Sequence, residues 1–259
     1  MNPRQLSITV IGSGNVAWHI ARKLYACGFV IKAIVGRNYD KAKALADSVR
    51  AKAVDDFKHI PDANVYILSL KDDVYTSVVS SLPKSSSIYL HTSGSLEIDI
   101  LKRLSPNYGV LYPFQTFSKG KDLNFSQIPF CLESSNFFTK EILMTLAEQL
   151  SEVHHWLTSQ QRKQLHLAGV FASNFPNALY VIVKQILDKQ KMDFSIALPL
   201  IKETVEKLDS LYPEEAQTGP AVRNDTKVIE KHIDMLSEPD YKITYELLTK
   251  IIQKQQNTE

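Results

Sequence analysis

The chain has 259 residues, of which 44% are hydrophobic, enough for one large or two modest domains with real cores. Its formal net charge at pH 7 is only +2, and basic residues are scattered among acidic ones. No surface for nucleic acid or for a charged membrane is therefore predicted. Cys27 and Cys131 are the only cysteines and lack metal-ligand spacing, so no metal site is expected.

The location of the protein is predicted from the ends and the apolar runs of the chain. The first apolar segment is short and ends at a glycine turn, which is a poor match to a signal peptide. No stretch is both long enough and uninterrupted enough to suggest a membrane span. With so few cysteines, these features favour a soluble cytoplasmic protein in a reducing compartment.

Short β-branched segments alternate with helical patterns over residues 1–157. Strands are expected at 6–11, 29–35, 53–54, 65–70, 88–91, 109–112, 128–132 and 153–156. Helices are expected between the first two strands and at 40–49, 73–82, 96–104 and 137–150. This alternation predicts an α/β fold with a doubly wound, mostly parallel Rossmann sheet and helices on both faces.

The pattern changes at Thr158, where Thr158 and Gln161 have the spacing of a capping box. A helix of about 30 residues is expected to follow, with further helices at 195–211, 227–236 and 241–253. The long helix is apolar almost all round from 165 to 183, yet polar residues interrupt it, so burial between domains or subunits is favoured over a membrane span. Residues 158–259 are therefore predicted to form an all-α C-terminal domain.

The segment 10–17 runs from a strand into a helix and matches the G-x-G-x-x-G/A dinucleotide fingerprint. Gly12 would permit the tight turn, Gly14 would let the backbone approach a pyrophosphate, and Ala17 would let the helix pack closely. The amides at the helix start, at Asn15 and Val16, would hold the phosphates. The alternative is an ordinary glycine turn that binds nothing.

The residues that follow the second predicted strand, 29–35, indicate whether the site prefers NAD or NADP. NAD-selective sites place a carboxylate there, whereas this chain has Gly36-Arg37-Asn38 and no acid before Asp40. Arg37 and Lys41 have the charge to pair with a 2′-phosphate, so NADP is preferred over NAD. The alternative for Arg37 is a simple surface arginine, and Asn38 caps the next helix in either case.

Further loops lie at the carboxyl ends of strands, where open α/β sheets bind ligands. Ser69, Leu70 and Lys71 are expected beside the nicotinamide ribose, and the turn 91–95 is expected to bring Ser93 and an imidazole to the nicotinamide side. A plain Ser/Gly turn is the alternative for 91–95. The aromatic stretch 112–117 suits either a substrate wall or packing on the second domain.

The all-α domain is expected to supply the opposite wall of the cleft. On a helical wheel, Lys163, His166, Ser173, Asn174 and Asn177 share one polar sector of an otherwise apolar helix. This stripe either bonds to the other domain or faces a wet cleft, and a satisfied core histidine is the alternative for His166.

A second candidate lies in the segment 218–225, which begins with a Thr-Gly-Pro turn. Arg223 could hold a substrate carboxylate or phosphate by a two-point contact. In the alternative, the segment is a connector in which Asp225 caps the helix that starts at Thr226.

The motifs at 12–17, 91–95, 112–117, 166–174 and 218–225 together resemble a bacterial family of NADP oxidoreductases. These proteins have a Rossmann-like domain and an all-α C-terminal domain of unassigned function. The family is similar to deazaflavin-dependent NADP reductases, ketopantoate reductases, pyrroline-5-carboxylate reductases and β-hydroxyacid dehydrogenases. The resemblance covers nearly the whole chain, and the segment 218–225 is its most specific mark.

One departure concerns catalysis. The β-hydroxyacid dehydrogenases carry a catalytic lysine four residues before an asparagine of the first C-terminal-domain helix. Counting back from Asn174 gives Val170, and counting back from Asn177 gives Ser173, so this lysine is missing. His166 is the candidate for proton transfer in its place, since an ordinary imidazole titrates near neutral pH.

The resemblance and the residues together predict hydride transfer between NADP(H) and a small polar carbonyl or imine compound. His166 would move the proton, Asn174 and Ser93 would orient the reacting oxygen or nitrogen, and Arg223 would hold an anionic group. The alternative is a non-catalytic NADP-binding sensor that acts through a partner. The apolar long helix and the resemblance to dimeric reductases also predict a homodimer.

Overall fold

A computed structural model describes residues 6–256 of the chain. The chain forms two compact units, Met1–Ser173 and Asn174–Glu259. The division falls inside the long helical stretch that follows Thr158, so that stretch contributes to both units. The domain boundary at 157/158 therefore stays a prediction.

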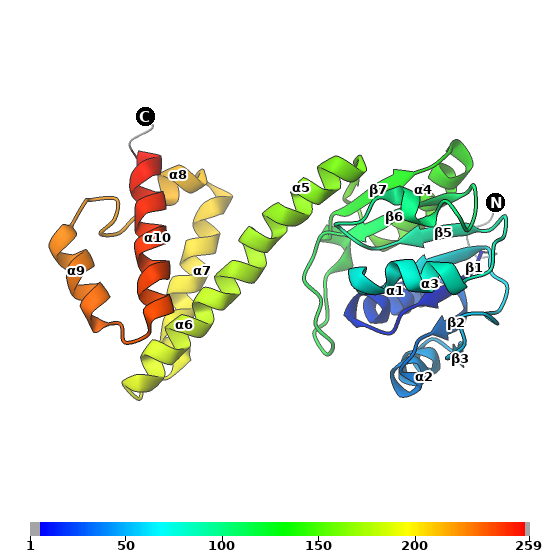
Figure 1. Cartoon of the computed structure of the whole chain (residues 1–259), viewed down its shortest axis with the longest axis horizontal. Coiled ribbons are helices and arrows are strands. Elements are labelled where there is room, and N and C mark those ends of the chain that lie inside the picture. Colours follow the sequence, from blue (N-terminus) through cyan, green and yellow to red (C-terminus); the bar gives the residue numbers. More distant parts are fainter. Residues whose placement is uncertain (1–5, 257–259) are drawn as a thin grey trace. The chain divides into compact units, whose positions relative to one another are not determined.

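An eight-stranded sheet with the order β3-β2-β1-β4-β5-β6-β7-β8 forms the first unit (Figure 1). Neighbouring strands are parallel except for β6 and β7, which pair antiparallel. The order 3-2-1-4-5-6 is that of a doubly wound Rossmann sheet, so the predicted fold class is confirmed. The strands are β1 (Ser7–Ile11), β2 (Val30–Val35), β3 (Lys52–Val54), β4 (Val65–Leu68), β5 (Ile88–His91), β6 (Tyr108–Pro113), β7 (Phe130–Ser134) and β8 (His154–Trp156).

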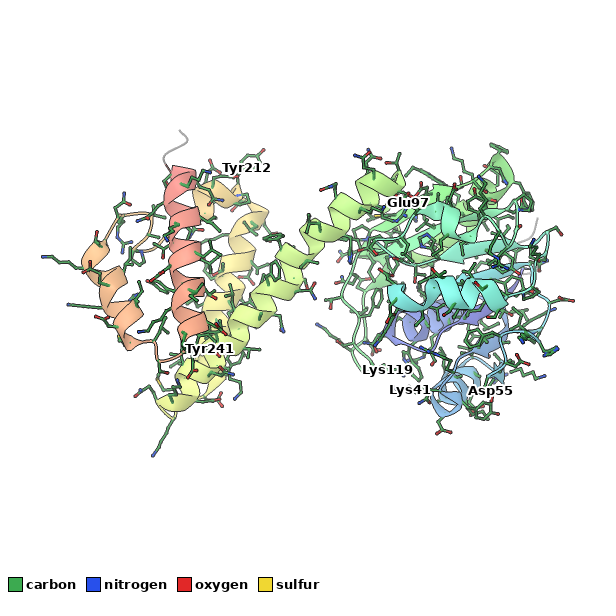
Figure 2. The ribbon with its side chains drawn as sticks, viewed as in Figure 1. Lys41, Asp55, Glu97, Lys119, Tyr212 and Tyr241 are labelled. Atoms are coloured by element: carbon green, nitrogen blue, oxygen red, sulfur yellow. The ribbon has the colours of Figure 1, made fainter. Side chains whose placement is uncertain are left out.

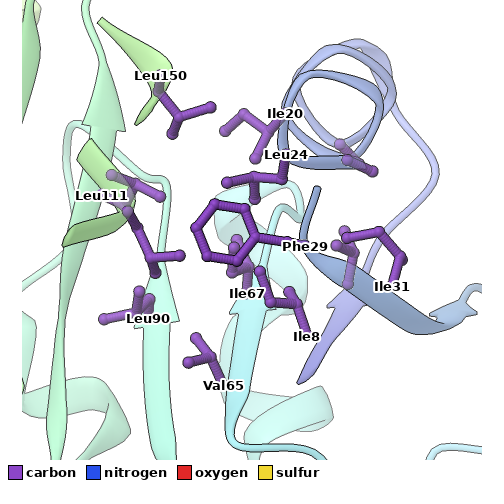
Figure 3. Packing of buried hydrophobic residues seen from close by; sticks show 14 of the residues in the cluster. Ile8, Ile20, Leu24, Phe29, Ile31, Val65, Ile67, Leu90, Leu111 and Leu150 are labelled. Atoms are coloured by element: carbon purple, nitrogen blue, oxygen red, sulfur yellow. The ribbon is translucent and has the colours of Figure 1, made fainter. Parts of the chain in front are cut away.

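The core of this unit has two layers, one on each face of the sheet. Strand alternation separates them: Val65 and Ile67 of β4 enter one cluster, while Tyr66 and Leu68 enter the other. The first cluster, drawn in part in Figure 3, is covered by helices α1 (Asn15–Ala26), α2 (Tyr39–Ser48) and α4 (Phe137–Leu150). Helix α3 (Tyr75–Ser81) covers the second cluster. Each fully buried large apolar side chain stabilises the fold by about 1.5–3 kcal/mol.

Helix α5 (Ser159–Gly169) begins at the predicted capping box, which is confirmed. The Thr158 hydroxyl accepts from the Gln161 N–H at 3.2 Å, and the Gln161 side chain accepts from the Thr158 N–H at 2.9 Å. These bonds satisfy backbone groups that a helix start otherwise leaves without partners.

A buried charge network fixes the start of α5. Arg162 is fully buried and pairs with Glu133 of β7 while donating to the Leu96 carbonyl. Glu133 also accepts from the Ser159 N–H at 3.0 Å. Since desolvation offsets much of the attraction in a buried pair, the main effect of this network is orientation. It joins α5 both to β7 and to the loop after β5.

A π-helical turn, Val170–Asn174, connects α5 to α6 (Phe175–Lys189). Pro176 lies in the first turn of α6 and has no N–H, and its ring would clash with the carbonyl of Ala172 in a regular helix. The wider turn relieves that clash. A wheel of 3.6 residues per turn therefore does not hold through this region, and the polar sector from His166 to Asn177 stays a prediction.

Helices are the only regular secondary structure in the described part of the second unit, 174–256, as predicted. None of the helices within 6–256 has the length and apolar character needed to cross a membrane. From this unit only Ala221 and Ile229 belong to the buried hydrophobic residues among those described. In addition to α6, its helices are α7 (Leu198–Glu206), α8 (Pro213–Ala216), α9 (Thr226–Met235) and α10 (Pro239–Gln256).

Three predicted elements differ from the structure. The helix expected at 96–104 is only a 3₁₀ turn, Ile98–Leu101, in which Ile100 N–H donates to Glu97 O and Lys102 N–H donates to Asp99 O. The helix expected at 195–211 is regular only in α7, because Pro199 is confined to a first helical turn. The strand expected at 65–70 ends at Leu68, where the chain turns into the loop after β4.

Candidate functional site

Two adjoining cavities lie in the first unit at the carboxyl ends of the parallel strands. The first has a volume of about 470 Å³ and lies along the loops after β1 and β2. The second, about 580 Å³, lies along the loops after β1, β4, β5 and β6. They share the residues at the point where the strand order reverses, between β1 and β4, which is where such sheets bind ligands. The shared residues are Gly14, Asn15, Ser69, Leu70 and Lys71.

Gly12 holds the loops after β1 and β4 in contact. It has a φ of +127°, which L side chains rarely adopt, and its N–H donates to Val35 O at 2.7 Å. A Cβ at this position would lie 2.1 Å from the Ser69 carbonyl oxygen, and the Ser69 N–H donates to Ile11 O at 2.8 Å. Only glycine allows the backbones to approach this closely.

Gly14 precedes α1, and packing does not explain its lack of a side chain. A Cβ there would meet nothing within 4 Å, and no side chain caps the start of α1. The free N–H groups at this helix start therefore face open space in both cavities, and a Cβ would fill part of that space. This cradle fits a phosphate group. Val16 lines the second cavity, whereas Ala17 is fully buried and serves helix packing.

Basic side chains surround the first cavity. Arg37, Lys41, Lys71 and Lys119 line it, and none of its lining residues within 6–256 is an acid. Asn38 also lines it and caps α2 by accepting from the Lys41 N–H at 2.9 Å. Such a surface favours a ligand with several negative charges.

Phe57 and Lys119 line the first cavity although the sequence did not point to them. Phe57 follows β3 and, with Val74 and Val78, gives the cavity an apolar part that suits a flat base. Lys119 comes from the connection between β6 and β7, which carries no motif at that position. No sequence signal identifies either residue, because only the sheet topology brings them to the glycine turn.

Hydroxyl groups tie together the loops along the second cavity. Thr92 donates from its hydroxyl to Ser69 Oγ at 3.1 Å, and the Ser95 hydroxyl donates to Asp72. Ser93 lines the cavity, and its Oγ accepts from the N–H groups of Ser95 and Leu96 at 3.1 and 3.2 Å. Ser93 Oγ also lies 3.4 Å from Ser95 Oγ, which can accept the Ser93 proton because its own hydroxyl donates to Asp72.

The prediction that the His91 imidazole faces the nicotinamide side is wrong. His91 is completely buried at the end of β5 and does not line the second cavity. Its Nδ1 accepts from the Ser93 N–H at 3.2 Å, so the ring stabilises the turn from its buried side. Burial, aided by the nearby positive charge of Arg162, lowers the pKa of His91 to about 3 and keeps the ring neutral.

His166 and Tyr112 form a hydrogen-bonded pair in the second cavity. Tyr112 Oη lies 3.0 Å from His166 Nδ1. Burial raises the pKa of Tyr112 to about 12, so the hydroxyl stays protonated and can donate to Nδ1. When Nδ1 accepts this bond, Nε2 is the ring nitrogen that faces away from Tyr112 and can carry a proton. A Cβ on Gly94 would lie 2.7 Å from His166 Nδ1, so glycine is required for this approach.

Two predicted site residues belong to the second unit. Asn174 is exposed at the end of the π-helical turn. Arg223 is exposed in the connection between α8 and α9, and its N–H donates to Gly219 O at 3.4 Å. Asp225 caps α9 by accepting from the Val228 N–H at 3.4 Å, as the connector interpretation expected. The roles of Asn174 and Arg223 stay predictions.

Two protein families match parts of the chain. Residues 7–92 match the family described as NADP oxidoreductase, coenzyme F420-dependent. Residues 128–252 match a domain of unknown function. A search of curated proteins gives no match.

Solved structures resemble the whole chain. A Bacteroides fragilis protein assigned as an NADP oxidoreductase is 37% identical, with a TM-score of 0.92, over 98% of this chain and 100% of its own. A Thermotoga maritima protein is 23% identical over 96% and 99% of the two chains, with a TM-score of 0.81. The reductive aminase of Aspergillus terreus, solved with NADPH and ethyl levulinate, shares the fold at 12% identity and a TM-score of 0.63, over 97% and 87%.

His91 predicts how stability depends on pH. Its folded-state pKa of about 3 lies below the ordinary 6.5, so the unfolded chain binds the proton first as pH falls. The folded state should lose about 1.4 kcal/mol per pH unit between pH 6.5 and pH 3 through this group. In His91→Asn, which keeps an acceptor near the Ser93 N–H, this part of the slope should vanish. Urea unfolding at several pH values, followed by tryptophan fluorescence, measures it, since Trp18 and Trp156 both lie in the first unit.

The control is His59→Asn, which removes a histidine whose side chain is 83% exposed. Parallel pH profiles for wild type and His91→Asn would contradict the assignment.

Proposed function

Because the chain belongs to the NADP oxidoreductase family of the Bacteroides fragilis protein, we propose that it transfers a hydride between NADP(H) and a small polar carbonyl or imine compound. Membership confirms the predicted family, the oxidoreductase class and NADP as cofactor. The observation that carries the substrate proposal is the pair of adjoining cavities, one basic and one holding the His166–Tyr112 pair.

The first cavity has the groups that NADP requires. The amides at the start of α1 and the open space beside Gly14 suit the pyrophosphate. Arg37 and Lys41 suit the 2′-phosphate, and the apolar part at Phe57 suits the adenine. In this proposal the nicotinamide occupies the residues shared by the two cavities.

The bound cofactor supplies or accepts the hydride, and the residues of the second cavity manage the proton. In the reductive direction, protonated His166 gives its proton to the carbonyl oxygen or imine nitrogen as the carbon is reduced. The Tyr112 hydroxyl donates to the neutral imidazole and accepts from the imidazolium, so it holds the ring in both states. Ser93 donates a hydrogen bond to the same substrate atom.

Asn174 and Arg223, both in the second unit, are the remaining residues for which we propose a role in substrate binding. Asn174 has an amide that orients a polar substrate atom, and Arg223 has a fork of donors that holds a carboxylate or phosphate. The support for these roles is their residue type and their match to the family motifs. The cytoplasmic location is also a proposal, supported by two cysteines that are not joined in a disulfide.

We also propose a homodimer built on the second unit. Large apolar side chains are exposed on its helices, among them Ile196, Leu200, Val205 and Tyr212, while its buried apolar residues are few. An all-helical unit with so small a core does not offset the entropy of ordering its chain. A second copy that packs on these exposed side chains supplies the missing burial by closing a two-fold interface.

The cofactor site is tested by titrating wild type and Arg37→Ala with NADPH and NADH. Arg37→Ala should weaken NADPH by about tenfold and leave NADH nearly unchanged, because only NADPH carries the 2′-phosphate. Lys43→Ala is the matched control, since Lys43 is an exposed lysine of α2 that pairs with Asp47 and lines neither cavity. A preference for NADPH that survives Arg37→Ala would rule out this role.

The catalytic proposal is tested by NADPH oxidation with a panel of carbonyl and imine compounds. His166→Ala should lower turnover by about 100-fold or more while NADPH affinity stays within a factor of about three. Tyr112→Phe should cause a smaller loss, since it removes only the support of the ring. Unchanged turnover in His166→Ala overturns the role. Tight NADPH binding by a wild type that reduces no compound favours the sensor function instead.

The dimer is tested by sedimentation of the purified chain. Wild type should run at twice the chain mass at micromolar concentration, and Leu200→Glu should weaken the association because it places a charge on the apolar face. Phe137→Glu is the control, since Phe137 is equally exposed but lies on α4 in the first unit. A monomeric wild type, or a Phe137→Glu variant that dissociates in the same way, contradicts the proposed interface.

A further inference from the structure

Lys119, in the connection between β6 and β7, lines the first cavity together with Lys41, and Figure 2 labels both residues. We propose that Lys119 binds a phosphate group of NADP(H), and that hydrogen bonds from α1 hold it in place. This inference rests on the proposed cofactor site and adds a residue to which the family motifs in the sequence do not point.

Two side chains of α1 hold the backbone just before Lys119. Asn15 Nδ2 donates to the Phe117 carbonyl at 2.8 Å, and His19 Nε2 donates to the Ser118 carbonyl at 3.0 Å. Asn15 and His19 are one helical turn apart, so both face the same segment. The His19 ring also packs on the Phe117 ring, with centroids 5.4 Å apart. The chain is thus fixed to the first turns of α1 where Lys119 begins.

The Lys119 ammonium lies beside α1 without an acidic partner. Its Nζ is 4.7 Å from the centroid of the Trp18 ring, a cation–π contact that keeps the charge near the start of the helix. No ion pair among the described residues includes Lys119. Lys119 lines the first cavity, in which the other charged lining residues, Arg37, Lys41 and Lys71, are also basic. Its charge is available to a ligand.

Phosphate is the chemistry that this cavity recognises. Helix amides at the glycine turn supply partial charges, while Arg37 and Lys41 supply full charges beside β2. Lys119 adds a full charge from a separate loop, the one that follows β6. Contacts from several cations and amides strengthen the binding of a phosphate and orient it.

The experiment titrates wild type, Lys119→Met and Lys119→Arg with NADPH and with NADH. Loss of a charged hydrogen bond should weaken binding by roughly tenfold in Lys119→Met, and Lys119→Arg should retain most of the affinity. Lys121→Met is the matched control, because Lys121 lies in the same loop and lines neither cavity. Equal weakening of both nucleotides assigns the contact to the pyrophosphate, and weakening of NADPH alone assigns it to the 2′-phosphate.

Unchanged affinity in Lys119→Met, with NADPH bound by wild type, overturns this inference and leaves the proposed function intact. Absence of NADPH binding by wild type overturns both. An equal loss in Lys121→Met also overturns it, since a general charge effect would then explain the result.

The attachment to α1 is tested with His19→Phe, which keeps an aromatic ring and deletes the N–H that Ser118 accepts. This variant should weaken NADPH several-fold in the wild-type background and have no further effect in Lys119→Met. Additive losses in the double variant would mean that His19 does not act through Lys119, and the positioning part of the inference falls.

Discussion

The close approach of Gly12 to the Ser69 carbonyl decides where the site lies. Because no side chain fits between them, the loops after β1 and β4 meet at the reversal of strand order, and both cavities are built around that contact. Residues on either side of it, such as Gly14 and Lys71, line both cavities. A ligand that crosses the contact therefore has one end in a basic environment and the other beside His166. One backbone constraint thus joins the proposed cofactor site to the proposed substrate site.

The second constraint is the attachment of α5. His166 lies one turn beyond Arg162, whose guanidinium joins Glu133 of β7 to the Leu96 carbonyl. Those partners belong to the strand beside β6 and to the loop that carries Ser93 and Gly94, so the network sets His166 against Tyr112. A buried ion pair is a poor source of stability but a rigid one. The network thus fixes the helix that carries His166, and the Tyr112 hydroxyl bonds to the His166 ring.

The sequence predicted what depends on local chemistry and missed what depends on topology. Glycine spacing, alternation and the Thr158 capping box identified the Rossmann unit and the start of α5. Lys119 and Phe57 reach the first cavity from loops without motifs, so only the folded sheet reveals them. The sequence placed the His91 imidazole in the cavity, whereas His91 ends a fully buried strand. Its ring accepts a hydrogen bond from the turn that lines the cavity, on the buried side of that turn. The π-helical turn before Pro176 was not predicted either, because a helical wheel assumes a constant 3.6 residues per turn.

The two cavities differ in the charge of the residues that line them. This difference fits the roles proposed for them, cofactor binding in the first and proton transfer in the second. The first is basic and lined by exposed lysine and arginine side chains, which neutralise phosphates while remaining solvated. The second is lined by one lysine and one aspartate, Lys71 and Asp72, and otherwise by polar and apolar residues, among them Tyr112, whose pKa is raised to about 12. A lysine at position 170 would add a permanent charge to the helix that carries His166. In the proposed mechanism, proton transfer therefore rests with His166, and the Tyr112 hydroxyl can donate to its ring or accept from it.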